Sequence, residues 1–126
     1  MNIRESAENY LETILIIQER KGSVRSIDIA NELNFSKPSV SVAMKNLREN
    51  GYICVDDNGY ITLTDSGYEI ADRMYERHRV ISEYFMLLGV EKDTAVKDAC
   101  RIEHIISIDS FEAIRAQHEK LKKERQ

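Results

Sequence analysis

Residues 26–63 read SIDIANELNFSKPSVSVAMKNLRENGYICVDDNGYITL, and they contain the signals of two short helices followed by a hairpin. Ser26 is suited to cap a helix over residues 27–33. Asp28 falls in the first turn of that helix, where a negative charge is favoured by the positive end of the helix dipole. The next three residues, 34–36, predict a tight turn.

A second helix is predicted over residues 37–49, because Ser36 is a good N-cap and Pro38 suits the first turn. Its apolar spacing predicts one buried face, formed by Val40, Ala43, Met44 and Leu47. Residues 52–55 and 60–63 are typical of β-strands, and the Asp-Asp-Asn-Gly sequence between them favours a hairpin turn. The order helix, turn, helix, hairpin is that of a winged helix-turn-helix.

Such a fold would insert the helix over 37–49 into the major groove of DNA with its outward side chains. Small hydroxyls suit phosphates or base edges, Val42 suits a thymine methyl group, and the lysines and arginines suit phosphates. The candidate DNA-binding residues are Arg25, Ser36, Lys37, Pro38, Ser39, Ser41, Val42, Lys45, Asn46 and Arg48. A protein–protein interaction module remains the alternative, because winged helices serve that purpose too.

The charge distribution supports the nucleic-acid interpretation once it is resolved by region. The 126-residue chain has a net charge of -4, which argues mildly against a DNA-binding protein. Residues 20–50, however, contain six basic and three acidic side chains, while 1–19 and 51–126 are both net negative. The positive segment coincides with the predicted helix-turn-helix, as expected of a surface that contacts phosphates.

The rest of the chain predicts helices over 4–20, 64–88, 93–106 and from 109 onward, so the fold class is mostly α. The second of these has an apolar stripe formed by Ile70, Met74, Ile81, Phe85 and Leu88. Asp109 and Glu112 are spaced as a capping box for the last helix, whose end at 120–126 is expected to fray. We therefore expect two domains, at residues 1–70 and 71–126.

Potential metal donors occur on three of the predicted helices. Cys100, Glu103 and His104 have the i, i+3, i+4 spacing that places side chains on one helical face, and a thiolate, a carboxylate and an imidazole are all transition-metal ligands. Further donors could come from His78, which flanks an apolar stripe, and from Asn9 and Glu12. Alternatively, Cys100 is an inert buried thiol and His78 a hydrogen-bonded core residue.

Other function classes lack their sequence signals. No apolar run approaches the length of a membrane span, and the N-terminal residues MNIRESAENY lack the apolar region of a secretory signal. The two cysteines, Cys54 and Cys100, are expected to be reduced thiols of a cytoplasmic protein. The sequence contains no metalloprotease, zinc-ribbon or nucleotide-binding motif, so we expect neither an enzyme nor a small-molecule substrate.

Three segments carry a family resemblance: IANELNFSKPSVSVAMKNLRENGYI at 29–53, residues 61–85 with the Tyr-Glu-Arg-His sequence at 75–78, and DACRIEHIIS at 98–107. They resemble the diphtheria toxin repressor and manganese transport regulator family over nearly the whole chain. The resemblance implies a homodimeric, metal-activated transcriptional repressor with a palindromic DNA operator. It also implies a helical dimerisation and metal-binding domain after the winged helix, and a short form without the C-terminal SH3-like domain.

The resemblance implies the metal ligands residue by residue. Cys100, Glu103 and His104 match the ligand segment of iron-type members, whereas manganese-type members have Glu at the first position. His78 matches a ligand of both types and Glu12 a ligand of the manganese type. Asn9 departs from both, since iron-type members have Met and manganese-type members Asp there, but its amide oxygen could still coordinate. The ancillary iron-type site is put in doubt by Ser82 and Val96 at two ligand positions, with Glu83 one residue out of register.

The expected cofactor is Fe(II) or Mn(II), with a lean to Fe(II) because the Cys100 thiolate favours a softer ion. We expect the metal to link the first helix to the later ones and so favour the DNA-binding state, and we expect dimer contacts to include Phe111 and Ile114. One rival is a metal-independent repressor that senses oxidants through Cys100. The other is a small metalloenzyme, for which so many protein donors would leave little room for substrate.

Overall fold

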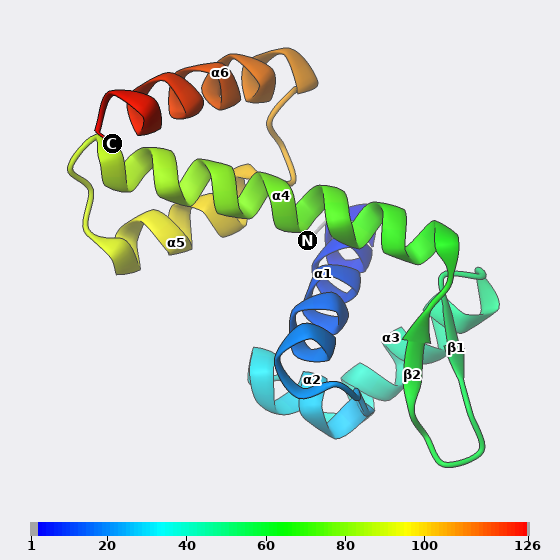
Figure 1. The fold of residues 1–126 in the computed structure, drawn as a ribbon. Helices are drawn as coiled ribbons and strands as arrows, with labels where there is room; N and C mark the ends of the chain where they lie inside the picture. The colour runs from blue at the N-terminus through cyan, green and yellow to red at the C-terminus, as the bar shows by residue number, and fades with distance from the viewer. Residues whose placement is uncertain (1–2, 126) are drawn as a thin grey trace. The chain divides into compact units, whose positions relative to one another are not determined.

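The computed structural model describes residues 3–125, and it consists of six helices and one two-stranded antiparallel sheet within that range. The chain divides into two compact units, Met1–Arg73 and Met74–Gln126. The first unit contains three helices, the hairpin and the start of a fourth helix, and the second contains the rest of that helix and two more (Figure 1). This confirms the predicted fold class, a mostly helical winged helix-turn-helix followed by helices.

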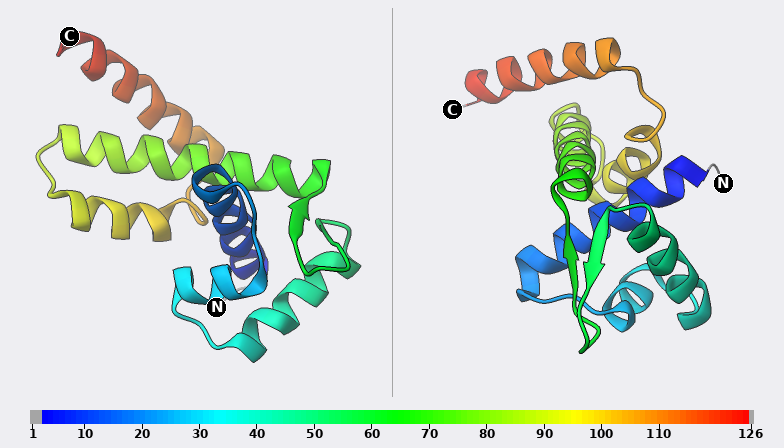
Figure 2. Two further views of the ribbon diagram at one scale, coloured as in Figure 1. Left: turned by 60° about the horizontal axis from the view of Figure 1, so that its bottom comes forward. Right: turned by 90° about the vertical axis from the view of Figure 1, so that its right-hand side faces the viewer.

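The first unit is built around helix α1 (Ile3–Lys21), whose fully buried side chains include Leu11, Ile14 and Ile17. Helices α2 (Ser26–Leu33) and α3 (Lys37–Glu49) pack on α1 and on each other. Strand β1 (Ile53–Val55) lies against α3 and strand β2 (Ile61–Leu63) against α1 (Figure 2). Ile53 pairs with Leu63 and Val55 with Ile61, as expected of a hairpin closed by residues 56–60.

Local signals explain the bounds of α2 and α3. The N-cap of α2 is Arg25 rather than the predicted Ser26, which is already helical; the backbone N–H of Arg25 donates to the Asp28 carboxylate over 2.8 Å. Asn34 adopts the left-handed conformation, with φ 57°, and ends α2. Ser36 caps α3 by accepting from the backbone N–H of Ser39, so these bounds follow from side chains close in sequence.

The second unit comprises most of α4 (Asp65–Leu87) with α5 (Lys92–Ile102) and α6 (Ile108–Glu124). Its core consists of Val80, Ile81, Ala99 and Phe111, one or two from each helix. Views from two sides show α5 and α6 on either side of α4 (Figure 2). The predicted dimer contact through Phe111 is therefore wrong, because this side chain is only 3% exposed and belongs to the core.

Three predicted helix ends in this unit are also wrong. Helix α5 ends at Ile102 instead of continuing to Ile106, and α6 begins after the N-cap Ser107, whose side chain accepts from the backbone N–H of Ser110. Of the residues expected to fray, those up to Glu124 lie in α6 and Arg125 is its C-cap, while Gln126 lies outside the described residues. Leu88, predicted in the apolar stripe, follows the end of α4 and is 58% exposed. Asp109, the predicted cap, lies inside the first turn of α6 instead, where its negative charge faces the positive end of the helix dipole.

The Asp28 carboxylate gives a first prediction. A hydrogen bond from Lys21 lowers the pKa of Asp28 below its ordinary value of 3.8, and the Arg25 backbone N–H acts in the same direction. Because the folded-state pKa is lowered, this stabilisation is present above the unfolded-state pKa and is lost as the pH falls through the folded-state pKa. We expect Asp28→Asn to lower the free energy of unfolding at neutral pH by less than about 1 kcal/mol.

The check is urea unfolding of both proteins at neutral pH and at a pH below the folded-state pKa of Asp28. The difference should shrink at the lower pH, because Asp28 is then neutral in the wild type as well. Equal differences at both pH values would contradict the proposed role of the charge.

Candidate metal cluster and DNA-binding surface

Helix α3 presents its predicted DNA-binding side chains to solvent. Val40, Met44 and Leu47 are buried as predicted, while Ala43 is half-buried instead of buried. Val42 is 61% exposed. All ten candidate DNA-binding residues are exposed: Arg25, Ser36, Lys37, Pro38, Ser39, Ser41, Val42, Lys45, Asn46 and Arg48. Nine of them belong to α3 or its N-cap, and Arg25 contacts the hairpin turn instead.

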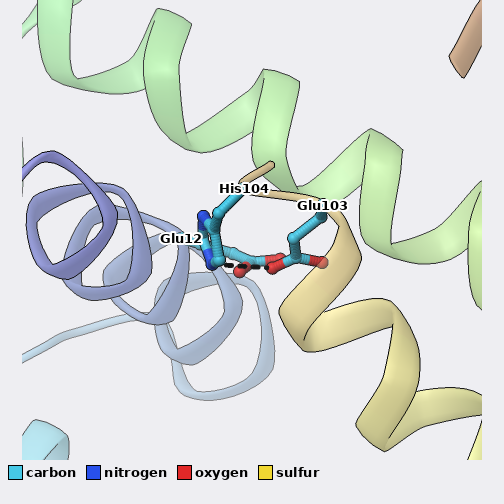
Figure 3. Close-up of side chains that lie close together, drawn as sticks. All are labelled: Glu12, Glu103 and His104. Atoms are coloured by element: carbon cyan, nitrogen blue, oxygen red, sulfur yellow. Dashed lines mark ion pairs between the residues drawn. The ribbon is translucent and has the colours of Figure 1, made fainter. Parts of the chain in front are cut away.

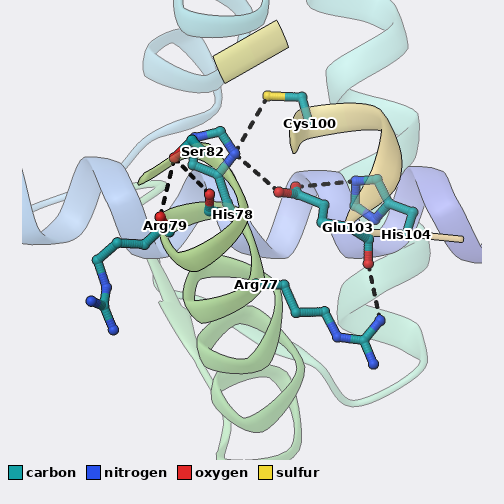
Figure 4. A network of polar contacts seen from close by, with 7 residues as sticks. All are labelled: Arg77, His78, Arg79, Ser82, Cys100, Glu103 and His104. Carbon is teal, nitrogen blue, oxygen red and sulfur yellow. Dashed lines mark hydrogen bonds and ion pairs between the residues drawn. The ribbon is translucent and has the colours of Figure 1, made fainter. Parts of the chain in front are cut away.

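In the second unit, four of the predicted metal ligands come together. His78 lies on α4, Cys100 on α5, and Glu103 and His104 directly after the last residue of α5. The His78 Nδ1 atom lies 3.0 Å from Glu103 Oε2 and 3.7 Å from Cys100 Sγ. His104 Nε2 lies 3.4 Å from Glu103 Oε1 (Figure 4). We call these four residues the donor cluster; Glu103 is at its centre and is completely buried.

The prediction that Cys100, Glu103 and His104 share one face of one helix is wrong in its geometry, because α5 ends at Ile102. Glu103 is the C-cap and His104 belongs to the following turn (Figure 3). The earlier end lets the chain turn around Glu103, so that one carboxylate oxygen faces His78 and the other faces His104. A straight helix would align the three side chains but would not wrap them around one carboxylate.

Arg77 fixes this turn, and the sequence pattern did not assign it this role. Its Nη1 donates to the backbone carbonyls of Glu103 and Ile106, each over 3.1 Å, and its guanidinium lies 5.4 Å from the centre of the Phe111 ring. Two carbonyls left without helical partners where α5 ends thereby obtain a charged donor. Arg77 precedes His78 on α4, so one helix holds the turn and contributes a donor to it.

The donor set fits a divalent transition metal. Ligand atoms that each lie about 2.1–2.3 Å from one ion are separated by about 3–4 Å, and three pairs of neighbouring donor atoms in the cluster lie 3.0 to 3.7 Å apart. Glu103 is completely buried between two imidazoles, and a carboxylate beside two imidazoles is a donor set that a cation can bind. Imidazole, thiolate and carboxylate together suit Fe(II), Mn(II) or Zn(II) better than Ca²⁺ or Mg²⁺, which prefer oxygen ligands.

The two donors predicted from the first helix lie on α1 in the first unit. Glu12, labelled in Figure 3, is buried, and Asn9, one turn earlier, is half-buried. The backbone carbonyl of Asn9 accepts from the Thr13 hydroxyl over 2.8 Å. Their assignment as ligands stays a prediction from the sequence.

The second unit contains one further imidazole–carboxylate pair that the sequence analysis missed. His118 on α6 is 5% exposed, and its Nε2 lies 3.0 Å from Glu83 Oε2 on α4. Glu83 lies one residue away from a ligand position of the ancillary metal site considered above. Ser82 occupies that position and donates its hydroxyl to the His78 carbonyl. The two partners are 35 positions apart in the sequence, which explains why no local spacing could reveal the pair.

Two family models match consecutive parts of the chain. Residues 2–60 match the N-terminal DNA-binding domain of iron-dependent repressors, and residues 64–125 match their metal-binding and dimerisation domain. The chain belongs to the iron-dependent repressor family. This family comprises metal-dependent transcriptional repressors, and the finding confirms the resemblance to diphtheria toxin repressor and manganese transport regulator proteins. The family assignment favours a metal-dependent repressor over a metal-independent repressor that senses oxidants through a thiol.

Relatives of this chain are named as transcriptional regulators. The transcriptional regulator MntR of Salmonella typhimurium is 32% identical over 118 residues, covering 91% of this chain and 75% of the relative. An uncharacterised helix-turn-helix regulator of Methanocaldococcus jannaschii is 32% identical over 120 residues, covering 94% of this chain and 96% of the relative. No helix within residues 3–125 is long and apolar enough to cross a membrane.

Solved structures of the same family share this fold. A manganese-dependent transcriptional repressor in complex with manganese superposes with a TM-score of 0.80 at 30% identity, over 90% of this chain and 52% of that protein. The IdeR protein of T. acidophilum has a TM-score of 0.76 at 25% identity, over 87% of this chain and 52% of that protein. The chain thus spans about half the length of these solved relatives.

Proposed function

We propose that this protein is a homodimeric repressor whose binding to a palindromic DNA operator depends on Fe(II) or Mn(II) held by the donor cluster. The observation that carries the proposal is the arrangement of His78, Cys100, Glu103 and His104 around one buried carboxylate. Residues 1–70 would form the DNA-binding domain and residues 71–126 the dimerisation and metal-binding domain. The regulated genes would be those of metal homeostasis.

The chain's own residues would prepare the site in defined ways. A bound divalent ion would supply the positive charge that neutralises the buried Glu103 carboxylate. His78 and His104 must be unprotonated and Cys100 must lose its proton to coordinate, so binding would release protons to solvent. Arg77 holds the turn after α5 through two carbonyls, which orients Glu103 before any ion binds. Such preorganisation lowers the entropic cost of binding.

Glu12 and Asn9 are proposed as further ligands on the strength of the family resemblance alone. Glu12→Gln and Asn9→Ala test them separately, with metal affinity as the readout. Loss of affinity in either variant would support that residue's assignment, and unchanged affinity would remove it from the ligand set.

The lean to Fe(II) rests on Cys100, whose thiolate suits a softer ion than an all-oxygen site does. The decisive experiment is an anaerobic titration of operator binding with Fe(II), Mn(II), Zn(II) or no metal at fixed salt. The probe is a DNA duplex selected from a random-sequence pool by the metal-loaded wild-type protein. We expect binding with Fe(II) or Mn(II) and none without metal. Equal binding with and without metal would overturn the proposal, and a response to Mn(II) but not to Fe(II) would overturn the lean to Fe(II).

Lys45 provides a test of the DNA surface. It is exposed on α3, on the side away from the buried Met44 and Leu47, and we propose that it contacts a phosphate. Losing one phosphate contact reduces the slope of log K against log salt by about one. We therefore expect this reduction in Lys45→Ala, measured by operator binding across a salt series. Lys97→Ala, which removes an exposed lysine from α5, is the control, and an equal effect of both variants would contradict the assignment.

Two exposed isoleucines favour a homodimer. Ile105 is 76% exposed and Ile108 is 67% exposed, and both lie around the connection from α5 to α6. Burying such side chains gains about 1.5–3 kcal/mol each, and an isologous interface buries each of them twice. We expect Ile105→Asp with Ile108→Asp to weaken dimerisation at least about 100-fold, measured by sedimentation equilibrium. Leu88→Asp, at an exposed leucine just after α4, is the control. A double variant that stays dimeric would exclude this interface.

A further inference from the structure

The hairpin of the first unit has an unusual charge for an element expected to approach DNA. Residues 50–72 contain no lysine or arginine, and two aspartates, Asp56 and Asp57, stand at the hairpin turn. Acidic side chains are repelled by the phosphates of a duplex, so the hairpin has no cation of its own to hold it there. Its position relative to the helices must then come from contacts inside the protein.

Arg25 contacts the hairpin turn through its side chain. It stands directly before α2, and its Nη2 donates to the backbone carbonyl of Asn58 over 2.5 Å. Its guanidinium also lies 5.0 Å from the centre of the Tyr60 ring, a cation–π distance. A Cβ atom added at Gly59 would lie only 3.4 Å from Arg25 Nη2, which shows how closely the guanidinium packs against the turn.

The backbone next to Arg25 contacts the same hairpin. The amide of Ile61 donates to the carbonyl of Val24 over 2.8 Å, so the first residue of β2 is bonded to the segment before α2. Inside the turn, the Asp56 side chain accepts from the amides of Asn58 and Tyr60, each over 2.9 Å. The turn is therefore internally ordered, and the Arg25 side chain connects it to the helix-turn-helix.

From these contacts we infer that Arg25 is a positioning residue: it fixes the hairpin turn relative to the helix-turn-helix instead of contacting a phosphate, as its charge alone suggests. A guanidinium is suited to this role because it can donate in its plane to Asn58 while its face lies over Tyr60. The expected effect of Arg25 on DNA affinity rests on the proposed function. Its expected effect on the hairpin of the free protein does not depend on DNA.

The first test is amide hydrogen exchange of the free protein. In Arg25→Met, which keeps the aliphatic stem, we expect exchange at Gly59 and Ile61 to accelerate at least about tenfold, because the turn opens more often. Tyr60→Leu leaves every charge in place and should accelerate the same amides. The Val40 amide in the first turn of α3 is the internal control and should not change. Unchanged exchange at Gly59 and Ile61 in Arg25→Met would overturn the inference.

The second test separates positioning from charge. Arg25→Met should weaken binding of the metal-loaded protein to the selected duplex about tenfold, a change of about 1.4 kcal/mol. Adding Asp57→Asn restores the formal charge of the hairpin region without restoring the contact to Asn58. We expect the double variant to bind as weakly as Arg25→Met. Recovery of wild-type affinity would show that Arg25 acts through its charge, whereas a wild-type protein that binds no duplex would contradict the proposed function and leave the exchange result standing.

Discussion

Glu103→Gln is expected to abolish metal-dependent operator binding while leaving the fold intact. The substitution keeps the shape of the side chain but removes the charge from a fully buried position between His78 and His104. Altering residues that merely support metal ligands typically costs about 10–100-fold in metal affinity, so the loss of a central ligand should exceed about 100-fold. The measurement is metal affinity by competition with a chelator, followed by operator binding at saturating metal.

The control for this prediction is Glu83→Gln, which removes a carboxylate from a second imidazole–carboxylate pair of the same unit. Glu83 faces His118 and is not part of the donor cluster, so metal affinity should stay close to that of the wild type. Thermal unfolding without metal distinguishes a lost ligand from a damaged fold. A cooperative unfolding transition in the metal-free variant, as in the metal-free wild type, would show that the fold is retained and only a ligand has been lost. Wild-type metal affinity in Glu103→Gln would exclude Glu103 as a ligand.

The sequence predicted the first unit well because its signals are local. Ser36 caps α3 with an amide three residues away, and the hairpin turn is closed by Asp56 and residues up to four positions later. Element ends in this unit differ from the prediction by one residue at most; α2, for example, starts one residue early, since Asp28 accepts from the Arg25 amide and so makes Arg25 the cap. Contacts between residues three or four positions apart produce recognisable spacings of residue types. These spacings predicted the two helices and the hairpin.

The second unit was harder because its decisive contacts join residues far apart in sequence. The spacing of Cys100, Glu103 and His104 identified the donors, but it implied a helix continuing through all three. The end of α5 is fixed instead by Arg77, which is 26 residues from Glu103. Likewise, Phe111 was predicted at a surface, although packing against Val80 and Ile81 places it in the core. The sequence spacing identified the donor residues, but it did not predict the turn that brings them together.

Gly67→Ala is expected to destabilise the first unit by about 3 kcal/mol, even though alanine favours helices by about 1 kcal/mol over glycine. Gly67 lies in the first turn of α4, and a Cβ atom there would come within 2.0 Å of the Tyr52 carbonyl oxygen. That oxygen is backbone and accepts from the Thr64 amide over 3.1 Å, so it cannot move without breaking the connection between the hairpin and α4. The steric cost therefore exceeds the gain in helix propensity.

The comparison with Gly51→Ala isolates the steric effect. Gly51 has φ 79° and open space around its Cα, so alanine there adds only backbone strain of about 1–2 kcal/mol. Each kcal/mol shifts the Tm of a domain of this size by about 4–8 °C, so Gly67→Ala should lower the Tm by at least about 10 °C and by clearly more than Gly51→Ala. Thermal unfolding followed by circular dichroism measures both. If Gly67→Ala were as stable as the wild type, the close approach of α4 to Tyr52 would be wrong, and with it the way in which the hairpin leads into the helix that contributes His78.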